Sequence, residues 1–198
     1  MQTSVTTWAD AKKNPQQNQQ DRIPFMKLLP GTNIVRVISN LGAYIYENLV
    51  LPGSKAAWGD RIRMSADPND PVRKYFGRDG KERYILLVID RRENEIKQLD
   101  CSPVIKDGLV DILETKNMQS EKTITPIDFD ISIKKDSKAA TPALVYAVHA
   151  FDNAPLLASD LALIEQFGDI DEKLQGCIKS PTPEQVERKM TNLAWVKP

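Results

Sequence analysis

The sequence predicts a mainly β fold with helices. We expect a five-stranded barrel with a hairpin extension, one helix between strands 3 and 4, and C-terminal helices. Three observations predict this fold: short β-branched or alternating runs recur between turn residues, one strong helix start occurs in mid-chain, and the last part of the chain is helical in pattern. A length of 198 residues fits one domain of ordinary size. Within it we expect a disordered polar arm at 1–22, the barrel at 23–152 and a helical segment at 153–198.

The first two strands are delimited by turn residues. Pro30-Gly31 is a turn signal, and the β-branched residues 34–38 follow it as a strand. Residues 43–51 form the second strand. Because side chains alternate between the two faces of a strand, Tyr44 and Tyr46 are expected on the same face.

Residues 53–81 have the composition of a long loop, because six of them are Gly or Pro. A structureless loop of this length inside a compact domain is uncommon and is often functional. This one interleaves basic and aromatic side chains, which are Trp58, Arg61, Arg63, Arg73, Lys74, Tyr75 and Phe76.

The third strand and its hairpin extension occupy residues 81–99. The apolar run 84–89 is β-branched and aromatic, and a charged turn and a second strand follow it. Ser102 then fits an N-cap with Pro103 at the first helical position, which predicts a helix over 103–115.

The remaining strands and helices complete a known order. Residues 127–134 alternate between apolar and polar side chains, as a half-buried strand does, and 144–151 form the last strand. Helices are expected over 155–174, with a break near Gly168, and over 183–194. Five main strands with a helix between the third and fourth is the order of the OB-fold barrel.

Charge and composition exclude several classes of protein. Lys+Arg and Asp+Glu both total 27, so no global charge draws the chain to nucleic acid, although residues 61–92 hold nine basic and five acidic side chains. Two cysteines and a single histidine make neither a disulfide framework nor a zinc site. No leader and no run of 18 apolar residues is visible, which favours a soluble protein of a reducing cytoplasm.

Candidate catalytic groups are few. Asp128 and Asp130 share one face of a strand and have the spacing of a metal pair, but a solvated face has the same pattern. Asp90, Glu95 and Lys97 have a superficial likeness to the carboxylate and lysine set of some nucleases, but charged hairpin residues explain them equally. Glycines are scattered singly, so no phosphate-binding loop is present. We therefore expect no enzyme, no cofactor and no metal.

Binding to single-stranded nucleic acid explains more of the chain. It needs cations along the phosphate backbone and aromatic faces for the bases. The basic and aromatic pieces of residues 53–81 supply both, and Arg83 with Tyr44 and Tyr46 adds to them. Arg36 is the one charge in an otherwise apolar strand, so its head group is expected to leave the core or to meet a ligand.

Three segments resemble single-stranded-DNA-binding proteins of tailed bacteriophages. Residues 25–37 (FMKLLPGTNIVRV) are similar to their opening motif. Residues 83–91 (RYILLVIDR) with 95–99 (EIKQL) resemble their central strand and hairpin, and 128–135 resembles a later strand. The resemblance implies an OB-fold core that coats single strands, with little sequence preference, during phage replication, recombination and repair.

Carried onto the matched positions, the resemblance implies DNA contacts by Arg36, Arg83, Arg91 and Lys97. The chain departs from such proteins twice. The stretch 66–74, where relatives carry a cysteine-rich zinc element, holds neither Cys nor His, and the chain ends without a strongly acidic tail. The C-terminal helices are therefore expected to serve contacts with replication or recombination proteins, or self-association through Leu161, Ile164 and Phe167.

Two other functions stay open at this point. The barrel can be a protein-interaction module that acts through its C-terminal helices, in which case partner binding is insensitive to salt and DNA is not bound. Less favoured is a metal-dependent nuclease built on Asp128 or Asp90.

Overall fold

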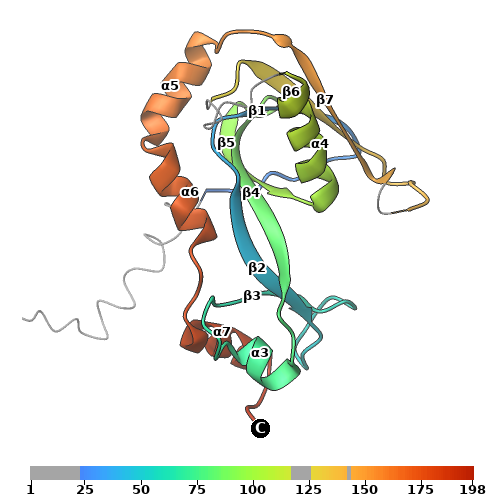
Figure 1. The fold of residues 1–198 in the computed structure, drawn as a ribbon, viewed down its shortest axis with the longest axis vertical. Helices are drawn as coiled ribbons and strands as arrows, with labels where there is room; N and C mark the ends of the chain where they lie inside the picture. Colours follow the sequence, from blue (N-terminus) through green and yellow to red (C-terminus); the bar gives the residue numbers. More distant parts are fainter. Residues whose placement is uncertain (1–22, 117–125, 142–143) are drawn as a thin grey trace, which may run out of the picture.

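The computed structural model describes residues 23–116, 126–141 and 144–198. The polar arm predicted for residues 1–22 lies outside the described residues. Seven strands form one antiparallel sheet in the described part of the chain, and five helices lie around it (Figure 1). None of these helices is long and apolar enough to cross a membrane.

The sheet has the strand order β3-β2-β4-β1-β6-β7, and β5 pairs with β4 outside this path. The strands are β1 (Gly31–Val37), β2 (Gly42–Leu49), β3 (Asp60–Arg63), β4 (Lys81–Asp90), β5 (Glu95–Cys101), β6 (Phe129–Lys135) and β7 (Tyr146–Asn153). The helices are α3 (Pro71–Phe76), α4 (Pro103–Thr115), α5 (Ala158–Phe167), α6 (Ile170–Ile178) and α7 (Pro183–Thr191).

Strands β1 and β2 follow one another along β4. Val37 of β1 lies opposite Val88, and Gly42 of β2 lies opposite Ile85, so both strands run antiparallel to the same partner. We call the part built on β1, β5, β6, β7 and the end of β4 the upper lobe. The part built on β2, β3 and the start of β4 is the lower lobe (Figure 1).

Each face of the sheet is covered by different helices. On one face of the upper lobe, Ile105 and Leu109 of α4 join the main core cluster. On the opposite face, Leu174 of α6 packs in a second cluster with partly buried side chains of α5, including Ile164 and Phe167. In the lower lobe Val186 and Met190 of α7 pack with Val72 of α3 in a third cluster.

A glycine allows the close approach of α6 to the sheet. A Cβ built on Gly42 would lie 2.7 Å from Cγ2 of Ile178 and 3.2 Å from Cδ1 of Leu174. Any side chain at this position would therefore push the helix away from β2. The hydrogen bond from the Arg63 guanidinium to the Cys177 carbonyl, 2.6 Å long, fastens the last turn of α6 to β3.

Most predicted elements are confirmed, and two predictions are corrected. The helix predicted over 103–115 has the bounds of α4, and Ser102 accepts the Ile105 amide as its N-cap. The break near Gly168 separates α5 from α6. The structureless loop predicted for 53–81 is wrong, because it contains β3 and α3. The local reason for α3 is clear: Asp70 caps its first turn through the Val72 amide, and Gly77 ends it in the left-handed conformation.

The second correction concerns the barrel. The sheet is open, because no pairing joins β7 to β5 or β3 among the described residues. Residues before β1 lie against the outer edge of β5 instead: the Met26 amide donates to the Gln98 carbonyl, and the Gln98 amide donates to the Pro24 carbonyl, both at 2.8 Å. This segment gives β5 hydrogen-bond partners along an edge that a closed barrel would pair with another strand.

Candidate nucleic-acid interface

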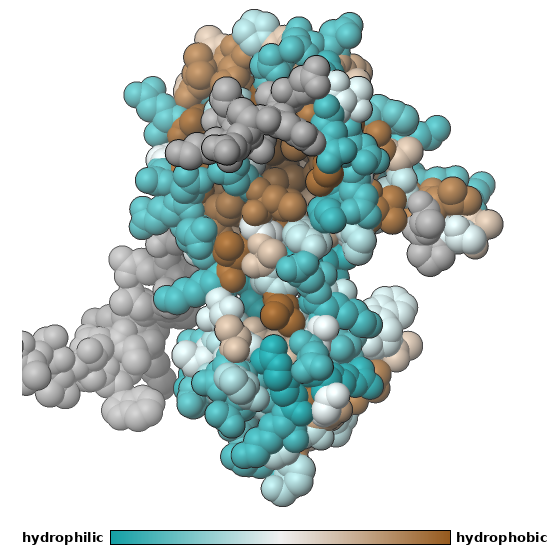
Figure 2. All heavy atoms as spheres, viewed as in Figure 1, coloured by the Kyte–Doolittle hydropathy of each residue, from teal (hydrophilic) through white to brown (hydrophobic). Residues whose placement is uncertain are grey.

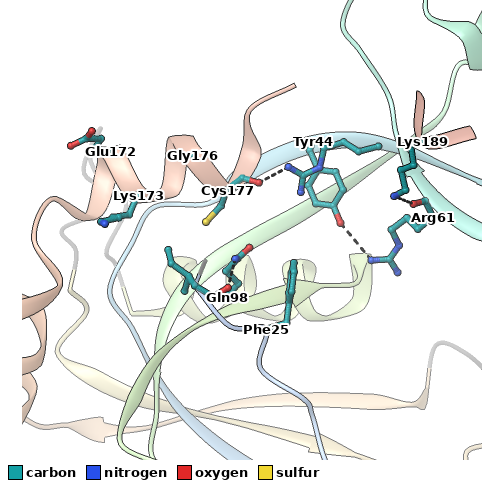
Figure 3. Close-up of a pocket in the computed structure, with 11 residues that line it drawn as sticks. Phe25, Tyr44, Arg61, Gln98, Glu172, Lys173, Gly176, Cys177 and Lys189 are labelled. Atoms are coloured by element: carbon teal, nitrogen blue, oxygen red, sulfur yellow. Dashed lines mark hydrogen bonds between the residues drawn. The ribbon is translucent and has the colours of Figure 1, made fainter. Parts of the chain in front are cut away.

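A charged cleft of about 650 Å³ lies between the two lobes, on the sheet face that α6 covers. Figure 3 shows its floor and walls. Tyr44, Arg61 and Arg63 come from β2 and β3, whereas Lys173 and Cys177 belong to α6. Phe25 and Gln98 form the opposite side, and Lys189 of α7 closes one end.

Strand register brings five of the predicted residues onto one side of the sheet, and three of them, Tyr44, Arg61 and Arg63, line the cleft. Tyr44 lies opposite Arg83 of β4, and Tyr46 lies opposite Arg63 of β3. Residues that face each other across a ladder project from the same side of the sheet. Arg61, two residues from Arg63, therefore shares that side. Two tyrosines and three arginines that are distant in sequence form one basic-aromatic cluster.

Arginines stack on the tyrosine rings of this cluster. The Arg63 guanidinium carbon lies 4.2 Å from the centroid of the Tyr44 ring, and that of Arg61 lies 5.0 Å from the Tyr46 centroid. The two rings are themselves 6.2 Å apart and tilted by 50°. Such cation–π contacts help to hold the two guanidinium groups beside the tyrosine rings. Burial raises the pKa of Tyr44, so its phenol is neutral and can act as a donor.

Asp100 bridges two arginines at the edge of the cleft. Its Oδ2 accepts from Nη1 of Arg61 at 2.5 Å, and its Oδ1 accepts from Nε of Arg83 at 2.6 Å. The Arg61 Nη1 atom also lies 3.5 Å from the Tyr44 hydroxyl. Burial acts to lower the pKa of Arg61, but the hydrogen bond and charge of Asp100 outweigh it and raise the pKa. Arg61 is therefore charged at any working pH.

The walls of the cleft are tied to its floor. Lys189 of α7 donates to the Arg61 carbonyl at 2.7 Å, which joins α7 to the edge of β3. The lining contains four cationic side chains and one acidic one, Glu172. A concave site with this excess of positive charge attracts anions and concentrates them along its length.

Two predicted arginines lie instead in a buried ion-pair network. Arg36 is only 2% exposed, and its Nε donates to Asp130 at 2.5 Å. Arg91 donates to Asp130 and also to Asp160 of α5, at 2.5 Å for the Nη1–Oδ1 pair. The expectation was that the Arg36 head group leaves the core or meets a ligand. In this structure the head group stays in the core, where Asp130 is its partner. The network joins β1, β6 and the start of α5, outside the cleft.

Lys97 and Trp58 are also separate from the cleft. Lys97 is buried and bonded to Asp90 at 3.2 Å and to Glu93. Trp58 lies on the connection between β2 and β3, is 75% exposed, and is not among the residues that line the cleft.

The four predicted residues of α3 pack against the end of the chain or bond locally. The Tyr75 and Phe76 ring centroids lie 5.2 and 6.3 Å from the Trp195 ring. Arg73 donates to the carbonyls of Ser65 and Asp67, and the Lys74 ammonium lies 5.4 Å from the centroid of Tyr75. The structure thus brings five of the thirteen predicted residues together: Tyr44, Tyr46, Arg61, Arg63 and Arg83.

Several residues of the cleft were missed by sequence reasoning. Phe25 belongs to the opening motif of the resemblance but was not predicted to contact DNA. It is 48% exposed and lines the cleft together with Gln98. Lys173 and Lys189 lie in helices whose amphipathic pattern says nothing about which sheet face they meet. Asp100 stands one residue before Cys101, where the sequence offers no signal of a bridge.

A second hollow and the apolar surface of the upper lobe are weaker candidates for a nucleic-acid site than the cleft. A hollow of about 80 Å³ near α4 is lined mainly by apolar side chains such as Leu86 and Ile131, too small and apolar for a charged chain. Figure 2 shows apolar surface gathered on the upper lobe and a mostly hydrophilic lower lobe.

The candidate metal and nuclease carboxylates are engaged with other side chains. Asp130 is held by Arg36 and Arg91, and Asp128 accepts from Asn153 at 2.9 Å. Asp90 of the nuclease-like set pairs with Lys97. Within the described ranges, His, Cys, Asp and Glu side chains form no group of three that could hold a metal ion.

Comparison with known proteins finds a phage relative. A protein named "Probable ssDNA-binding protein", from Escherichia phage T5, is 32% identical over 139 residues, which are 60% of this chain and 52% of the relative. The chain thus spans about half the length of the curated relative that it matches. No family model and no solved structure matches the chain.

Proposed function

We propose that this protein binds single-stranded DNA in the cleft between its lobes and has no catalytic activity. The observation that carries the proposal is the basic-aromatic cluster of Tyr44, Tyr46, Arg61, Arg63 and Arg83 on one face of the sheet. Single-strand binding needs both cations and ring faces, and each stacked base contributes about 1–3 kcal/mol. The likeness to the phage T5 protein supports the same function.

The fold supports this proposal by analogy. We take β1 and β2 together as one long bent strand, followed by β4, β5, the helix α4, β6 and β7. This is the OB-fold order, opened at the closing strand pair and with β3 and α3 inserted after the first strand. In this assignment α5 and α6 cover part of the outer sheet face. The bound DNA single strand is therefore confined to the part of that face beside β2 and β3.

We propose a function in the cell that is compatible with these properties. A cleft that contacts phosphates and base faces, and that reads few base edges, binds without sequence preference. We propose that the protein coats and protects single strands during phage DNA replication, recombination and repair. Replication or recombination proteins are its expected partners. Ile164 and Phe167 pack on the chain's own sheet, which leaves Leu161, 54% exposed, as the remaining apolar contact of the predicted self-association set.

Fluorescence anisotropy tests the proposal. Labelled oligo(dT) and a duplex of the same length are titrated with the full chain at several salt concentrations. The proposal requires single-strand binding that exceeds duplex binding and weakens steeply as salt rises. Equal binding to both, or binding to neither, would contradict the proposal, and binding to neither would favour a protein-interaction module.

A further inference from the structure

The Arg61–Asp100–Arg83 bridge has the form of an occupied anion site. Each oxygen of the Asp100 carboxylate accepts from a different arginine, at 2.5 Å from Arg61 and 2.6 Å from Arg83. The two arginines come from β3 and β4, and Asp100 comes from β5. A phosphodiester presents two non-bridging oxygens in a similar way, and arginine pairs favour such two-oxygen groups.

Accessibility separates this bridge from the buried ion pairs of the upper lobe. The Arg61 side chain is 43% exposed and that of Asp100 is 20% exposed. In the network of the upper lobe, by contrast, the Arg36 side chain is 2% exposed and that of Asp160 is fully buried. A ligand can therefore reach the Asp100 bridge, and Arg61 has room to turn away from its carboxylate partner.

We infer that Arg61 and Arg83 form a phosphodiester site of the DNA cleft, and that Asp100 occupies this site in the free protein as an internal competitor. The inference rests on the proposed function and adds a role for a residue of opposite charge. Asp100 positions the two guanidinium groups, and an incoming phosphate takes its place. Displacing Asp100 costs free energy, and this cost weakens the binding of an isolated phosphate at this site. A DNA chain, whose other phosphates contact the rest of the cleft, still binds well.

Asp100→Asn tests the inference, because asparagine keeps the shape and an acceptor oxygen but removes the charge. At low salt we expect the variant to bind oligo(dT) at least threefold more tightly than the unchanged protein. The slope of log K against log salt should stay the same, because the phosphate makes the same contact with Arg61 and Arg83 in both proteins once Asp100 is displaced. Asp152→Asn, an equal charge change on exposed β7, should leave both quantities unchanged.

Two further variants keep the test decisive. In an Arg61→Gln/Arg83→Gln background, Asp100→Asn should have no effect on affinity or slope. If Asp100→Asn fails to fold, as judged by its thermal midpoint, Asp100→Ser removes the same charge and carries the same expectation. Affinity that is unchanged or weaker in a folded Asp100 variant, while the unchanged protein binds oligo(dT), overturns this inference alone. Failure of the unchanged protein to bind would overturn the proposed function as well.

Discussion

The guanidinium of Arg63 stacks 4.2 Å above the ring of Tyr44 and donates a 2.6 Å hydrogen bond to the carbonyl of Cys177. One side chain of β3 thus joins the floor of the cleft to the end of α6. The negative end of a helix dipole favours a cation at this place. Binding of DNA and packing of α6 are therefore expected to share Arg63.

The cluster arginines should account for much of the salt dependence of binding. Arg61→Gln/Arg63→Gln removes two cations from the cleft, and each phosphate contact contributes a slope of about 0.7 for a single strand. We expect the slope of log K against log salt to fall by about 1.4 and the affinity at low salt to fall more than about tenfold. Anisotropy titrations measure both.

Arg73→Gln is the matched control for that variant. Its guanidinium donates to the Ser65 and Asp67 carbonyls of its own loop, so its loss should lower stability and leave the slope unchanged. A slope that falls as much in Arg73→Gln as in the cleft variant would place the contacts outside the cleft.

Tyr46 should contribute to binding through its ring. Tyr46→Ala removes a half-buried aromatic face beside Arg61, and loss of one stacked base costs about 1–3 kcal/mol of binding free energy. Tyr46→Phe keeps the ring and should bind as the unchanged protein does. If the Phe variant lost as much affinity as the Ala variant, the phenol rather than the ring would make the contact.

The pairing of Arg91 with Asp160 should stabilise the fold. Asp160 is fully buried at the start of α5, and breaking a buried ion pair costs about 3–5 kcal/mol. We therefore expect Asp160→Asn to lower the free energy of unfolding by about 3 kcal/mol in urea titrations. Glu165→Gln, an exposed change on the same helix, should have little effect.

The same pair sets a pH dependence. Burial acts to raise the pKa of Asp160, but the hydrogen bonds from Arg91 and from the Leu157 amide outweigh it, so this pKa lies below its ordinary value. The unfolded chain then binds the proton more readily than the folded one, and the stabilisation present above about pH 4 is lost as pH falls through the folded pKa. Asp160→Asn should lack this part of the acid transition.

Gly59 should be required for the connection between β2 and β3. Its φ is +84°, and a Cβ at this position would lie 2.2 Å from the backbone oxygen of Leu49. Both strain and overlap oppose a side chain there, so Gly59→Ala should cost at least about 2 kcal/mol of stability. Gly176→Ala in α6, where nothing lies within 4 Å of the new Cβ, is the control and should be neutral or stabilising. Equal stability of the two variants would contradict this account.

The sequence predicted local structure better than the way in which the elements meet. Ser102 with Pro103 gave the start of α4, and the alternation in residues 127–134 gave β6, because both signals are local. The helix α3 was missed although Asp70, Pro71 and Gly77 are its signals, because the surrounding Gly and Pro residues suggested a loop.

The sequence does not show which tertiary partner a charged side chain has, and this explains why the predicted site differs from the observed cleft. Arg36 and Arg61 both precede an apolar residue in the sequence, yet one is buried against Asp130 and the other lies exposed in the cleft. Which carboxylate an arginine meets, and how deeply the pair is buried, depends on strand pairing, and residues 36 and 130 are too far apart in sequence for any local signal. The cleft residues of α6 and α7 were unpredictable for the same reason.

Photochemical cross-linking with oligo(dT) that carries a halogenated pyrimidine, read out by peptide mass spectrometry, tests the location of the strand most directly. The account predicts adducts on Phe25 and Tyr44, which line the cleft, and on the neighbouring Tyr46, and their loss in the Arg61→Gln/Arg63→Gln variant. Adducts confined to Phe151 of β7 or to Tyr75 and Trp195, with the cleft unmodified, would contradict it.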